Sequence, residues 1–235
     1  MASRSGQISE ILEMTRRAFG QRLETERGLE LFDTQVPPLE PAGPVFRDLE
    51  SFRDNIQDCR KCPLGKTRTK FVFGVGHPHA EIMFIGEAPG RDEDLQGEPF
   101  VGRAGQLLDK ILAAIKFSRK DVYIANILKC RPPENRDPLP EEAELCLPYL
   151  LQQIKMIQPA FICCLGRIAA QFLLDTKTPL GKLRGKFMDY YGMKLLVTYH
   201  PAALLRFPSY KVNTWEDMKM LRREYDRMKG QPPVV

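Results

Sequence analysis

The sequence lacks any long apolar run and any segment with the pattern of a secretory signal. Its longest apolar stretches, Ala160–Leu165 and Leu195–Val197, are far shorter than the roughly 18 residues that a membrane-spanning helix requires. The first 20 residues are interrupted by five charged side chains, which is not the pattern of a signal peptide. These two absences exclude a membrane protein and predict a cytoplasmic location.

Cysteine is also sparse, with six residues among 235. Without a secretory signal, these thiols are expected in a reducing compartment, where metal or cluster ligation is more common than disulfide formation. A dinucleotide-binding fingerprint is missing as well, because Gly74-Val-Gly76 lacks the third glycine and precedes a predicted strand. The sequence therefore excludes a secreted disulfide scaffold and gives no sign of a dinucleotide site.

Charge of both signs is present but unevenly distributed. Lys and Arg number 35 against 30 Asp and Glu, which gives a net charge of +5. Residues 1–58 carry 11 acidic and 7 basic side chains, whereas residues 59–80 carry five basic side chains and no acidic one. A second basic segment, residues 176–214, carries seven basic side chains and one acidic. Each basic segment alone is typical of a solvated face, but both together on one face would form a phosphate-binding surface.

An N-terminal arm precedes the part of the chain that can build a core. Apolar residues at helical spacing predict an amphipathic helix over Ser5–Arg27, which is a candidate site for a protein partner. Val36–Pro44 holds four prolines in nine residues and is typical of a linker. Residues 1–46 are therefore predicted to be a helix and linker, and residues 47–229 a single domain.

Strand and helix patterns alternate along residues 47–229. We expect helices over 47–57, 104–115, 140–157, 167–174 and 215–228, and strands over 81–85, 122–127, 160–165, 187–191 and 195–199. This alternation predicts an α/β fold whose mainly parallel sheet is covered by helices on both faces. Ligands of such sheets bind where loops leave the carboxyl ends of the strands.

Four of the cysteines have the spacing of ligands. Cys59 and Cys62 form a Cys-x-x-Cys pair, and Cys130 and Cys146 supply a second pair further along the chain. A redox-active dithiol would follow a strand, and none is predicted there, so four-thiolate ligation is favoured over it and over free buried thiols. Zinc and an iron–sulfur cluster both suit four cysteines, and the spacing does not choose between them. The other two cysteines, adjacent in the predicted strand 160–165, are expected to be core residues.

Three predicted strands end in a polar side chain. Glu87 follows the first strand in a turn rich in glycine and proline, Asn126 ends the second strand, and His200 ends the last. Each also has a plain structural interpretation: Glu87 as a solvated turn residue, Asn126 as a helix cap or turn former, and His200 as a structural histidine. The run Asp92–Asp94 is a candidate magnesium site, although three consecutive acids point in different directions and are more often solvated.

Four ordered motifs give the sequence a family resemblance. They are Gly86-Glu-Ala-Pro-Gly90, Gly97-Glu-Pro-Phe-Val-Gly-Arg-Ala-Gly105, Asn126-Ile-Leu-Lys-Cys-Arg-Pro-Pro133 and His200-Pro-Ala-Ala-Leu-Leu-Arg206. Together with Cys59, Cys62 and Cys146, they resemble the family 4 uracil-DNA glycosylases, the iron–sulfur branch of that superfamily. The resemblance covers about residues 59–222 and assigns nothing to the N-terminal arm.

The resemblance implies a fold, a cofactor and an activity. The fold is a three-layer α/β/α sandwich around a central, mainly parallel four-stranded sheet, with the N-terminal helical extension in addition. Cys59, Cys62, Cys130 and Cys146 would hold a [4Fe–4S] cluster, which chooses iron–sulfur over zinc. The implied activity is hydrolytic removal of uracil from double- or single-stranded DNA by a monofunctional, monomeric DNA-repair glycosylase that leaves an abasic site.

The resemblance also implies roles for the pocket residues. Phe100 would stack on a flipped uracil, Asn126 would read its N3 and O4 edge, and His200 would hydrogen-bond the charge that develops at O2. Glu87 would hold or deprotonate the attacking water. Glu93 is a candidate for the space that a tyrosine fills in relatives outside family 4. The implied uracil-binding set is Gly86, Glu87, Ala88, Gly90, Glu93, Phe100, Asn126 and His200, of which Glu87 and His200 are catalytic.

The segment Ala203–Arg206 is the predicted DNA wedge. Leu204 and Leu205 would fill the stack that the flipped base vacates, and Arg206 would lie near a phosphate. In the alternative interpretation, Leu204 and Leu205 are core residues at the start of a helix.

Two other functions remain open from the residues alone. A zinc-stabilised DNA-binding module would use the basic segments without catalysis. A divalent-metal-dependent nuclease would use Glu87 and Asp92–Asp94. Absorbance at about 400 nm and release of free uracil separate the glycosylase from the first alternative, and activity in EDTA excludes the second.

Overall fold

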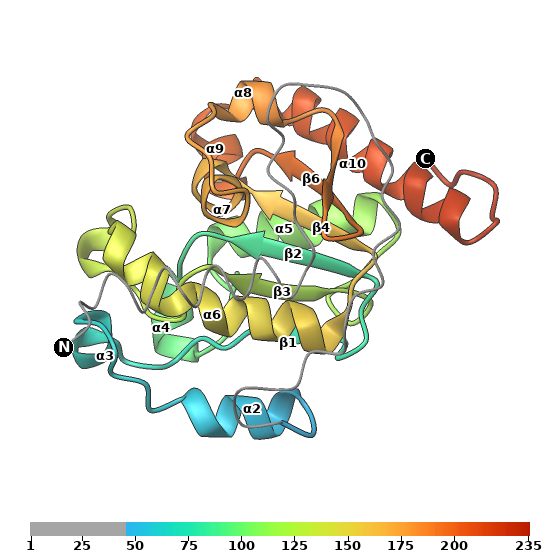
Figure 1. The fold of residues 1–235 in the computed structure, drawn as a ribbon. Helices are drawn as coiled ribbons and strands as arrows, with labels where there is room; N and C mark the ends of the chain where they lie inside the picture. The colour runs from blue at the N-terminus through green and yellow to red at the C-terminus, as the bar shows by residue number, and fades with distance from the viewer. Residues whose placement is uncertain (1–45) are drawn as a thin grey trace, which may run out of the picture. The chain divides into compact units, whose positions relative to one another are not determined.

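A computed structural model describes residues 46–235 (Figure 1). The compact unit Asp48–Val235 contains the sheet and the helices around it. The predicted helix over Ser5–Arg27 and the linker over Val36–Pro44 lie outside the described residues. Within the described residues, no helix is both long and apolar enough to cross a membrane.

The centre of the domain is a six-stranded mixed sheet in the order β1-β3-β2-β4-β6-β5. Its four inner strands run parallel, and β1 and β5 pair antiparallel to them at the two edges. The predicted α/β fold with a mainly parallel sheet is confirmed. The predicted strand over 187–191 is β5, whereas β1 was not predicted, and these two edge strands extend the sheet beyond the four strands that the resemblance implies. The strands are β1 (Val75–Gly76), β2 (Ile82–Gly86), β3 (Tyr123–Asn126), β4 (Phe161–Leu165), β5 (Phe187–Tyr190) and β6 (Met193–Thr198).

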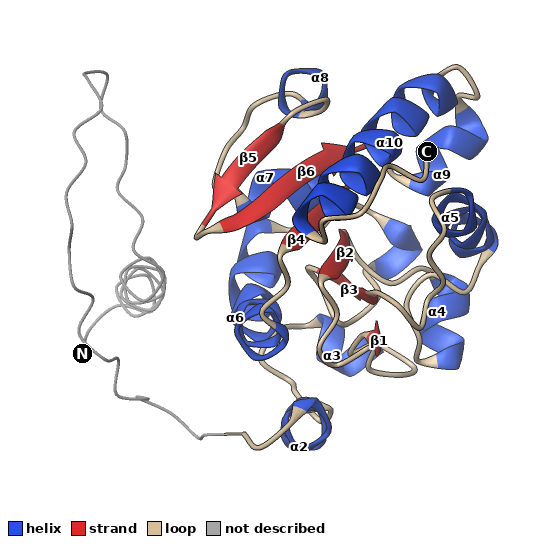
Figure 2. Cartoon of the chain, turned by 90° about the vertical axis from the view of Figure 1, so that its right-hand side faces the viewer, coloured by secondary structure: helices blue, strands red, loops and turns tan. Residues whose placement is uncertain are grey.

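Helices cover both faces of this sheet (Figure 2). Helices α6 (Pro140–Ile157) and α7 (Arg167–Leu173) lie on one face, and α5 (Arg103–Ala114) and α10 (Tyr210–Met228) lie on the other. The sequence patterns predicted these four helices and α2. They missed the other short helices, because four to six residues hold too little of a helical period. The shorter elements are α2 (Leu49–Ile56), α3 (Leu64–Thr67), α4 (Arg91–Gln96), the 3₁₀ turn η1 (Pro133–Asn135), α8 (Leu180–Leu183) and α9 (Pro201–Arg206).

Strands β2 and β4 are buried from end to end. Because helices cover them on both faces, their sequences are uninterrupted apolar runs and do not alternate with polar residues. Cys163 and Cys164 are adjacent in β4 and both fully buried, as predicted for core residues, and burial raises the pKa of both thiols. The packed inner strands form a firm support for the loops at their carboxyl ends.

A buried carboxylate on α10 fixes the end of β6. Asp217 is fully buried and accepts hydrogen bonds from the Thr198 hydroxyl at 2.7 Å and from the Arg184 guanidinium at 2.8 Å. Thr198 is the last residue of β6, two positions before His200. The hydrogen bonds to Asp217 therefore hold the start of the loop that carries His200.

Candidate active site

Loops at the carboxyl ends of β2, β3 and β6 meet around a pocket of about 340 Å³. In Figure 1 the arrowheads of β2 and β4 point toward the end of the domain where these loops lie. Seven of the eight predicted uracil-binding residues line the pocket, together with Arg206 from α9. The seven are Glu87, Ala88, Gly90, Glu93, Phe100, Asn126 and His200.

Gly86, the eighth residue, shapes the pocket by having no side chain. A Cβ atom at this position would lie 2.4 Å from Asn126 Oδ1 and 2.6 Å from the Phe100 ring. Both distances are too short for non-bonded atoms, so only glycine lets the two side chains approach the end of β2 so closely. Gly86 therefore acts by allowing close approach and does not need to touch a ligand.

Asn126, at the end of β3, presents an unused hydrogen-bond acceptor. The residue is 2% exposed, and its Oδ1 atom has no hydrogen-bond partner among the described residues. Its main chain is fixed, because its carbonyl accepts from Lys129 Nζ at 3.0 Å and the Ile127 amide donates to the Gly86 carbonyl at 3.0 Å. A buried, unpaired amide oxygen is costly, so a water molecule or a ligand in the pocket must complete its bonding.

Phe100 stands in the left-handed backbone region with φ at 56°, which is rare for a bulky side chain. Arg119 holds this turn by donating to the Phe100 carbonyl at 3.0 Å and to the Pro99 carbonyl at 2.6 Å. Gly105 makes room for it, since a Cβ atom there would lie 1.7 Å from the Phe100 carbonyl oxygen. The Phe100 ring lies 5.4 Å from the His200 ring, centroid to centroid, so one pocket wall is aromatic.

His200 is the N-cap of α9 and is held as a neutral imidazole. Its Nδ1 atom accepts a hydrogen bond from the Ala202 main-chain N–H at 3.2 Å. Burial, aided by the positive charge of Arg206, lowers the pKa of His200 to about 4. Because Nδ1 is used as an acceptor, the ring proton lies on Nε2, which gives this loop a neutral N–H donor.

Glu87 is a half-buried carboxyl group with a high pKa. Burial raises the pKa of Glu87 to about 7, and the negative charge of Asp137 acts in the same direction. Arg167 and Arg206 partly offset these effects. A carboxyl group that titrates near neutral pH is suited to accept a proton from a substrate or a water molecule.

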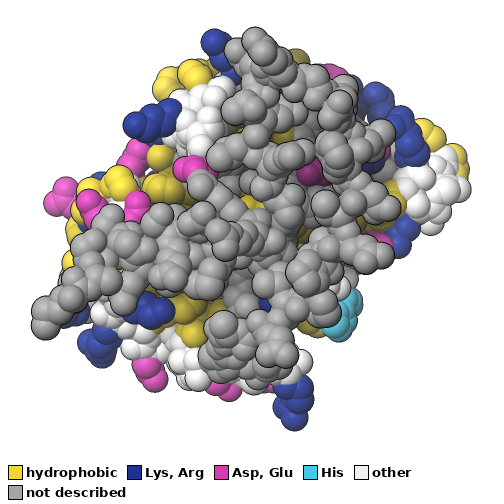
Figure 3. All heavy atoms as spheres, in the orientation of Figure 1, with side chains coloured by type: hydrophobic (Ala, Val, Ile, Leu, Met, Phe, Trp, Pro, Cys, Tyr) yellow, Lys and Arg dark blue, Asp and Glu magenta, His cyan; other side chains and the backbone are white. Residues whose placement is uncertain are grey.

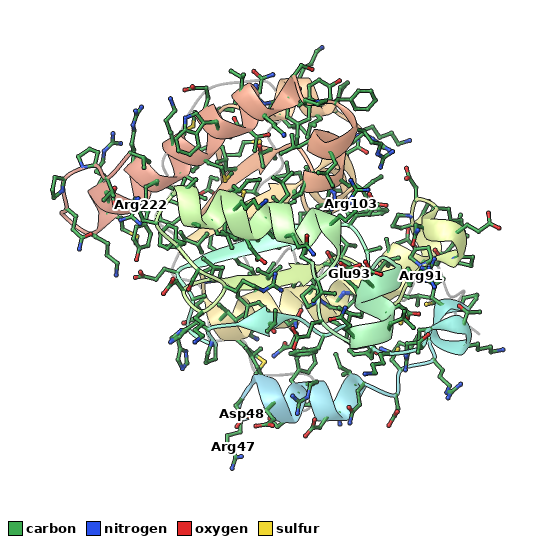
Figure 4. The ribbon with its side chains drawn as sticks, turned by 180° about the vertical axis from the view of Figure 1, so that it is seen from behind. Arg47, Asp48, Arg91, Glu93, Arg103 and Arg222 are labelled. Atoms are coloured by element: carbon green, nitrogen blue, oxygen red, sulfur yellow. The ribbon has the colours of Figure 1, made fainter. Side chains whose placement is uncertain are left out.

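Glu93 fastens the rim of the pocket. One carboxylate oxygen accepts from the main-chain N–H groups of Val101 at 2.9 Å and Gly102 at 3.0 Å, and the other accepts from Gly90 at 3.1 Å. Figure 4, which shows the domain from behind, labels Glu93 and Arg91, both of helix α4. Glu93 thus lies beside Gly90, and its role in filling the space that a tyrosine takes in relatives outside family 4 stays a prediction.

The sequence interpretation missed the loop that follows β3. Asp137 of this loop pairs with Arg167 at 2.9 Å, and Arg136 pairs with the buried Glu142 at 2.7 Å. These ion pairs hold the loop, and through Asp137 they affect the pKa of Glu87. The Arg-Pro-Pro sequence after Cys130 was the available signal, since prolines restrict a loop to few conformations. The pocket-lining residues of the loop are Pro132, Asn135, Arg136 and Asp137.

The three consecutive acids at Asp92–Asp94 do not form a magnesium site. Asp94 is buried, and its Oδ1 atom accepts from the main-chain N–H groups of Thr69 at 2.9 Å and Lys70 at 3.4 Å. Glu93 is occupied at the pocket rim, and Asp92 is exposed. Across residues 46–235, no group of three His, Cys, Asp or Glu side chains is arranged to hold a single metal ion.

The four predicted ligand cysteines lie on three segments, and a hydrogen-bond donor lies near the sulfur atom of three of them. Cys59 and Cys62 are half-buried, whereas Cys130 and Cys146 are buried. Burial is the main cause that raises the pKa of Cys130, and the nearby thiols of Cys59 and Cys62 add to it. The donors, each at 3.3 Å from sulfur, are the Tyr149 hydroxyl to Cys59, the Arg68 guanidinium to Cys130 and the Lys129 main-chain N–H to Cys146.

Two of the three predicted DNA-contacting residues are accessible. Leu204 is 1% exposed and faces α5, so for this residue the core interpretation replaces the wedge. Leu205 is 40% exposed, and the next apolar residue, Phe207, is 54% exposed. Arg206 is exposed and lines the pocket. An apolar tip beside Arg206 at the pocket is therefore present, but it is formed without Leu204.

Comparison with known sequences gives consistent matches. A profile of the uracil DNA glycosylase superfamily matches residues 73–219. A type-4 uracil-DNA glycosylase of Archaeoglobus fulgidus is 51% identical over 184 residues, which cover 75% of this chain and 92% of the relative. The type-4 enzyme of Saccharolobus solfataricus is 46% identical over 74% of this chain and 85% of its own length. That of Thermotoga maritima is 45% identical over 67% of this chain and 83% of its own length.

Proposed function

The chain belongs to the type-4 uracil-DNA glycosylases of the uracil-DNA glycosylase superfamily, and we propose that its pocket at the strand ends binds the excised base. The enzyme excises uracil from DNA in repair, as an N-glycosyl hydrolase. The observation that carries the site assignment is the buried, unpartnered Oδ1 atom of Asn126 beside the Phe100 ring. A base must leave the stack to reach such a pocket, where a flat wall and an edge-reading amide can recognise it.

The Asn126 amide can distinguish uracil from cytosine. Its Oδ1 atom would accept from N3–H of uracil, and its Nδ2 group would donate to O4. Cytosine presents the opposite pattern, with an amino donor at C4 and no proton on N3, so both groups would remain unpaired in a buried site. A mismatch of this kind can discriminate by about 10⁴–10⁵.

Phe100 and His200 would act on the base itself. The Phe100 ring offers a face for stacking, and the neutral Nε2–H of His200 would donate to O2. Breaking the N-glycosidic bond leaves negative charge on the base, and a donor aimed at that charge typically contributes about 10²–10³ in rate. The low pKa of His200 keeps the ring neutral, so the pocket holds a donor without a buried cation.

Glu87 would act on the sugar side of the N-glycosidic bond. Its ionised form can take a proton from the attacking water and offset the positive charge of the oxocarbenium-like sugar. No lysine lines the pocket among the described residues, which supports hydrolysis without a lyase step through a protein amine. Leu205 and Arg206 would fill the vacated stack and contact a phosphate, respectively.

We also infer that Cys59, Cys62, Cys130 and Cys146 hold a [4Fe–4S] cluster. Four thiols and three nearby hydrogen-bond donors suit a group carried by thiolates. Zinc also suits four thiolates, and the choice of the cluster rests on the resemblance to the iron–sulfur branch of the superfamily. When bound, the cluster would crosslink the segments that carry the thiols, and no step of the hydrolysis needs its electrons.

One assay tests the proposed function. The full-length protein is incubated in EDTA with U:G, U:A and T:G duplexes and with a uracil-containing single strand, and free base is measured together with strand integrity. We expect free uracil and uncut backbones. Uracil retention would favour a binding module, and metal-dependent strand cutting would favour a nuclease. Three features stay predictions from the sequence: the enzyme is monomeric, it is cytoplasmic, and its N-terminal arm binds a protein partner.

A further inference from the structure

A second hollow, of about 440 Å³, lies at the opposite end of α4 from the uracil pocket. Gly90, the N-cap of α4, lines the uracil pocket, whereas Gly97, its C-cap, lines the second hollow. Arg60, Lys66 and Lys70 also line this second space, and it is called the basic hollow below.

The three cations of the basic hollow have no carboxylate partner within residues 46–235. Arg60, Lys66 and Lys70 are exposed, and none of the ion pairs of the described chain includes them. Of the lining residues that the structure describes, Asp58 alone is acidic. These cations belong to residues 59–80, which carry five basic side chains and no acidic one. Their charge is therefore available to an anion from outside the domain.

The wall of the basic hollow is fixed by hydrogen bonds. The Arg68 guanidinium donates to the main-chain carbonyl groups of Gln57 and Cys59, both at 2.6 Å. Asp94 of α4 accepts from the Lys70 main-chain N–H at 3.4 Å. Arg68 thus serves the fold, whereas Lys66 and Lys70 project from a wall tied to α4.

The distance along α4 matches a short step along a DNA strand. The six residues of α4 span about 9 Å at 1.5 Å per residue. A DNA strand advances about 3.4 Å along its axis per nucleotide, so a strand whose axis ran parallel to α4 would pass the basic hollow roughly three nucleotides from the base pocket. In Figure 1, α3 lies at the same end of the sheet as the arrowheads of β2 and β4, and in Figure 3, in the same orientation, basic side chains stand in this region. DNA placed across this edge would meet both sites.

We propose that the basic hollow binds a backbone phosphate of the uracil-containing strand, about three nucleotides from the uracil, through Lys66 and Lys70. The proposal rests on the proposed function in taking DNA, with its flipped base in the pocket, as the ligand. A phosphate contact carries no sequence information but fixes the register of the strand. Arg206, from the second basic segment, lines the pocket at the other end of α4, so both basic segments contribute to this DNA-facing edge.

The first test measures salt dependence with the full-length holoprotein. Lys66→Gln, Lys70→Gln and the double variant are titrated against a duplex with a tetrahydrofuran abasic site, between about 50 and 300 mM salt. We expect each substitution to reduce the slope of log K against log salt by about 0.9, and the double variant by about twice that amount. Lys120→Gln, at an exposed lysine before β3, is the control and should leave the slope unchanged. Equal slopes for the double variant and the control would overturn the proposal.

The second test places the phosphate. Methylphosphonates, which remove the charge of one phosphate, are introduced singly at each position of the uracil strand. The wild type should lose affinity at one position two to four nucleotides from the lesion, and the double variant should be insensitive at that position. A sensitivity that persists in the double variant would overturn the proposal.

Single-turnover release of uracil separates this proposal from the proposed function. The double variant should need a higher DNA concentration than the wild type to reach its half-maximal rate of release, because Lys66 and Lys70 would contact the strand and do not line the base pocket. If the wild type released no uracil, the proposed function would be wrong. The salt slopes and the methylphosphonate scan would still test the phosphate site.

Discussion

The fully buried ammonium group of Lys129 donates a hydrogen bond of 3.0 Å to the main-chain carbonyl of Asn126. A second bond, of 2.6 Å, goes to the Oε1 atom of Gln153. Burial lowers the pKa of Lys129 to about 8, while the thiols of Cys146 and Cys130 act in the opposite direction. Lys129 therefore joins the proposed uracil-reading residue to the segment that carries the proposed cluster ligands.

Replacing Lys129 with methionine should weaken both the fold and the pocket. The change leaves the Asn126 carbonyl and Gln153 Oε1 buried without their donor, and each such loss costs about 1–3 kcal/mol. We expect the free energy of unfolding to fall by about 2–4 kcal/mol in a denaturant titration, with slower single-turnover uracil release. Lys120→Met, at an exposed site, is the control. Equal stability of the two variants would show that Lys129 does not support this loop.

Arg119 should act as a positioning residue for Phe100. Arg119→Met removes both donors that hold the Pro99 and Phe100 carbonyl groups, so the left-handed turn should lose its fixed geometry. Because stacking is made before bond cleavage, the DNA concentration for half-maximal single-turnover rate should rise by about tenfold, more than the maximal rate falls. Arg119→Lys should recover part of the loss. Asp109→Asn, which removes only a surface ion pair of Arg119, should have little effect, and a loss as large as that of Arg119→Met would contradict this role.

The pH dependence of uracil release should report Glu87. The ionised carboxylate is the active form, and its pKa is raised to about 7, so the single-turnover rate should fall as pH decreases through about 7. His200, with a pKa near 4, should add no further change between pH 5 and 9. Asp137→Asn should shift the midpoint to lower pH, because it removes a negative charge and frees Arg167 from its ion pair. A midpoint that stays in place would show that Glu87 is not the titrating group.

The cluster should depend on Cys130 but not on Cys163. Cys130→Ala is expected to lose the brown absorbance near about 400 nm and to lower the unfolding temperature, because cluster binding is coupled to folding. Cys163→Ala removes an equally buried thiol of the core and should retain the colour. A colourless wild-type protein with stoichiometric zinc would contradict the assignment.

The sequence was sufficient for the long elements and for the strand-end residues. The helix Pro140–Ile157 was predicted with its observed bounds, because a proline marks its start and apolar residues recur over many turns. Glu87, Asn126 and His200 could be placed together because parallel strands bring their carboxyl ends to one edge.

The remaining features depend on contacts between distant residues. Arg119 reaches the Phe100 carbonyl across 19 positions, and no local pattern encodes such a bond. Leu204 and Leu205 have the same chemistry, and only the packing of α9 against α5 decides which is buried. The basic hollow likewise arises because Asp94 ties the segment with Lys70 to α4.

The most direct test of the pocket is the base selectivity of Asn126→Asp. An ionised carboxylate cannot donate to O4 of uracil, but it can accept from the amino group of cytosine. Single-turnover rates are measured on U:G duplexes and on matched cytosine-containing duplexes, with the wild type and Asn135→Asp, a change elsewhere in the pocket lining, for comparison. We expect uracil release by Asn126→Asp to fall by at least about 10²-fold, with cytosine release detectable in this variant alone. Uracil release by Asn126→Asp at the wild-type rate would show that Asn126 does not read the base.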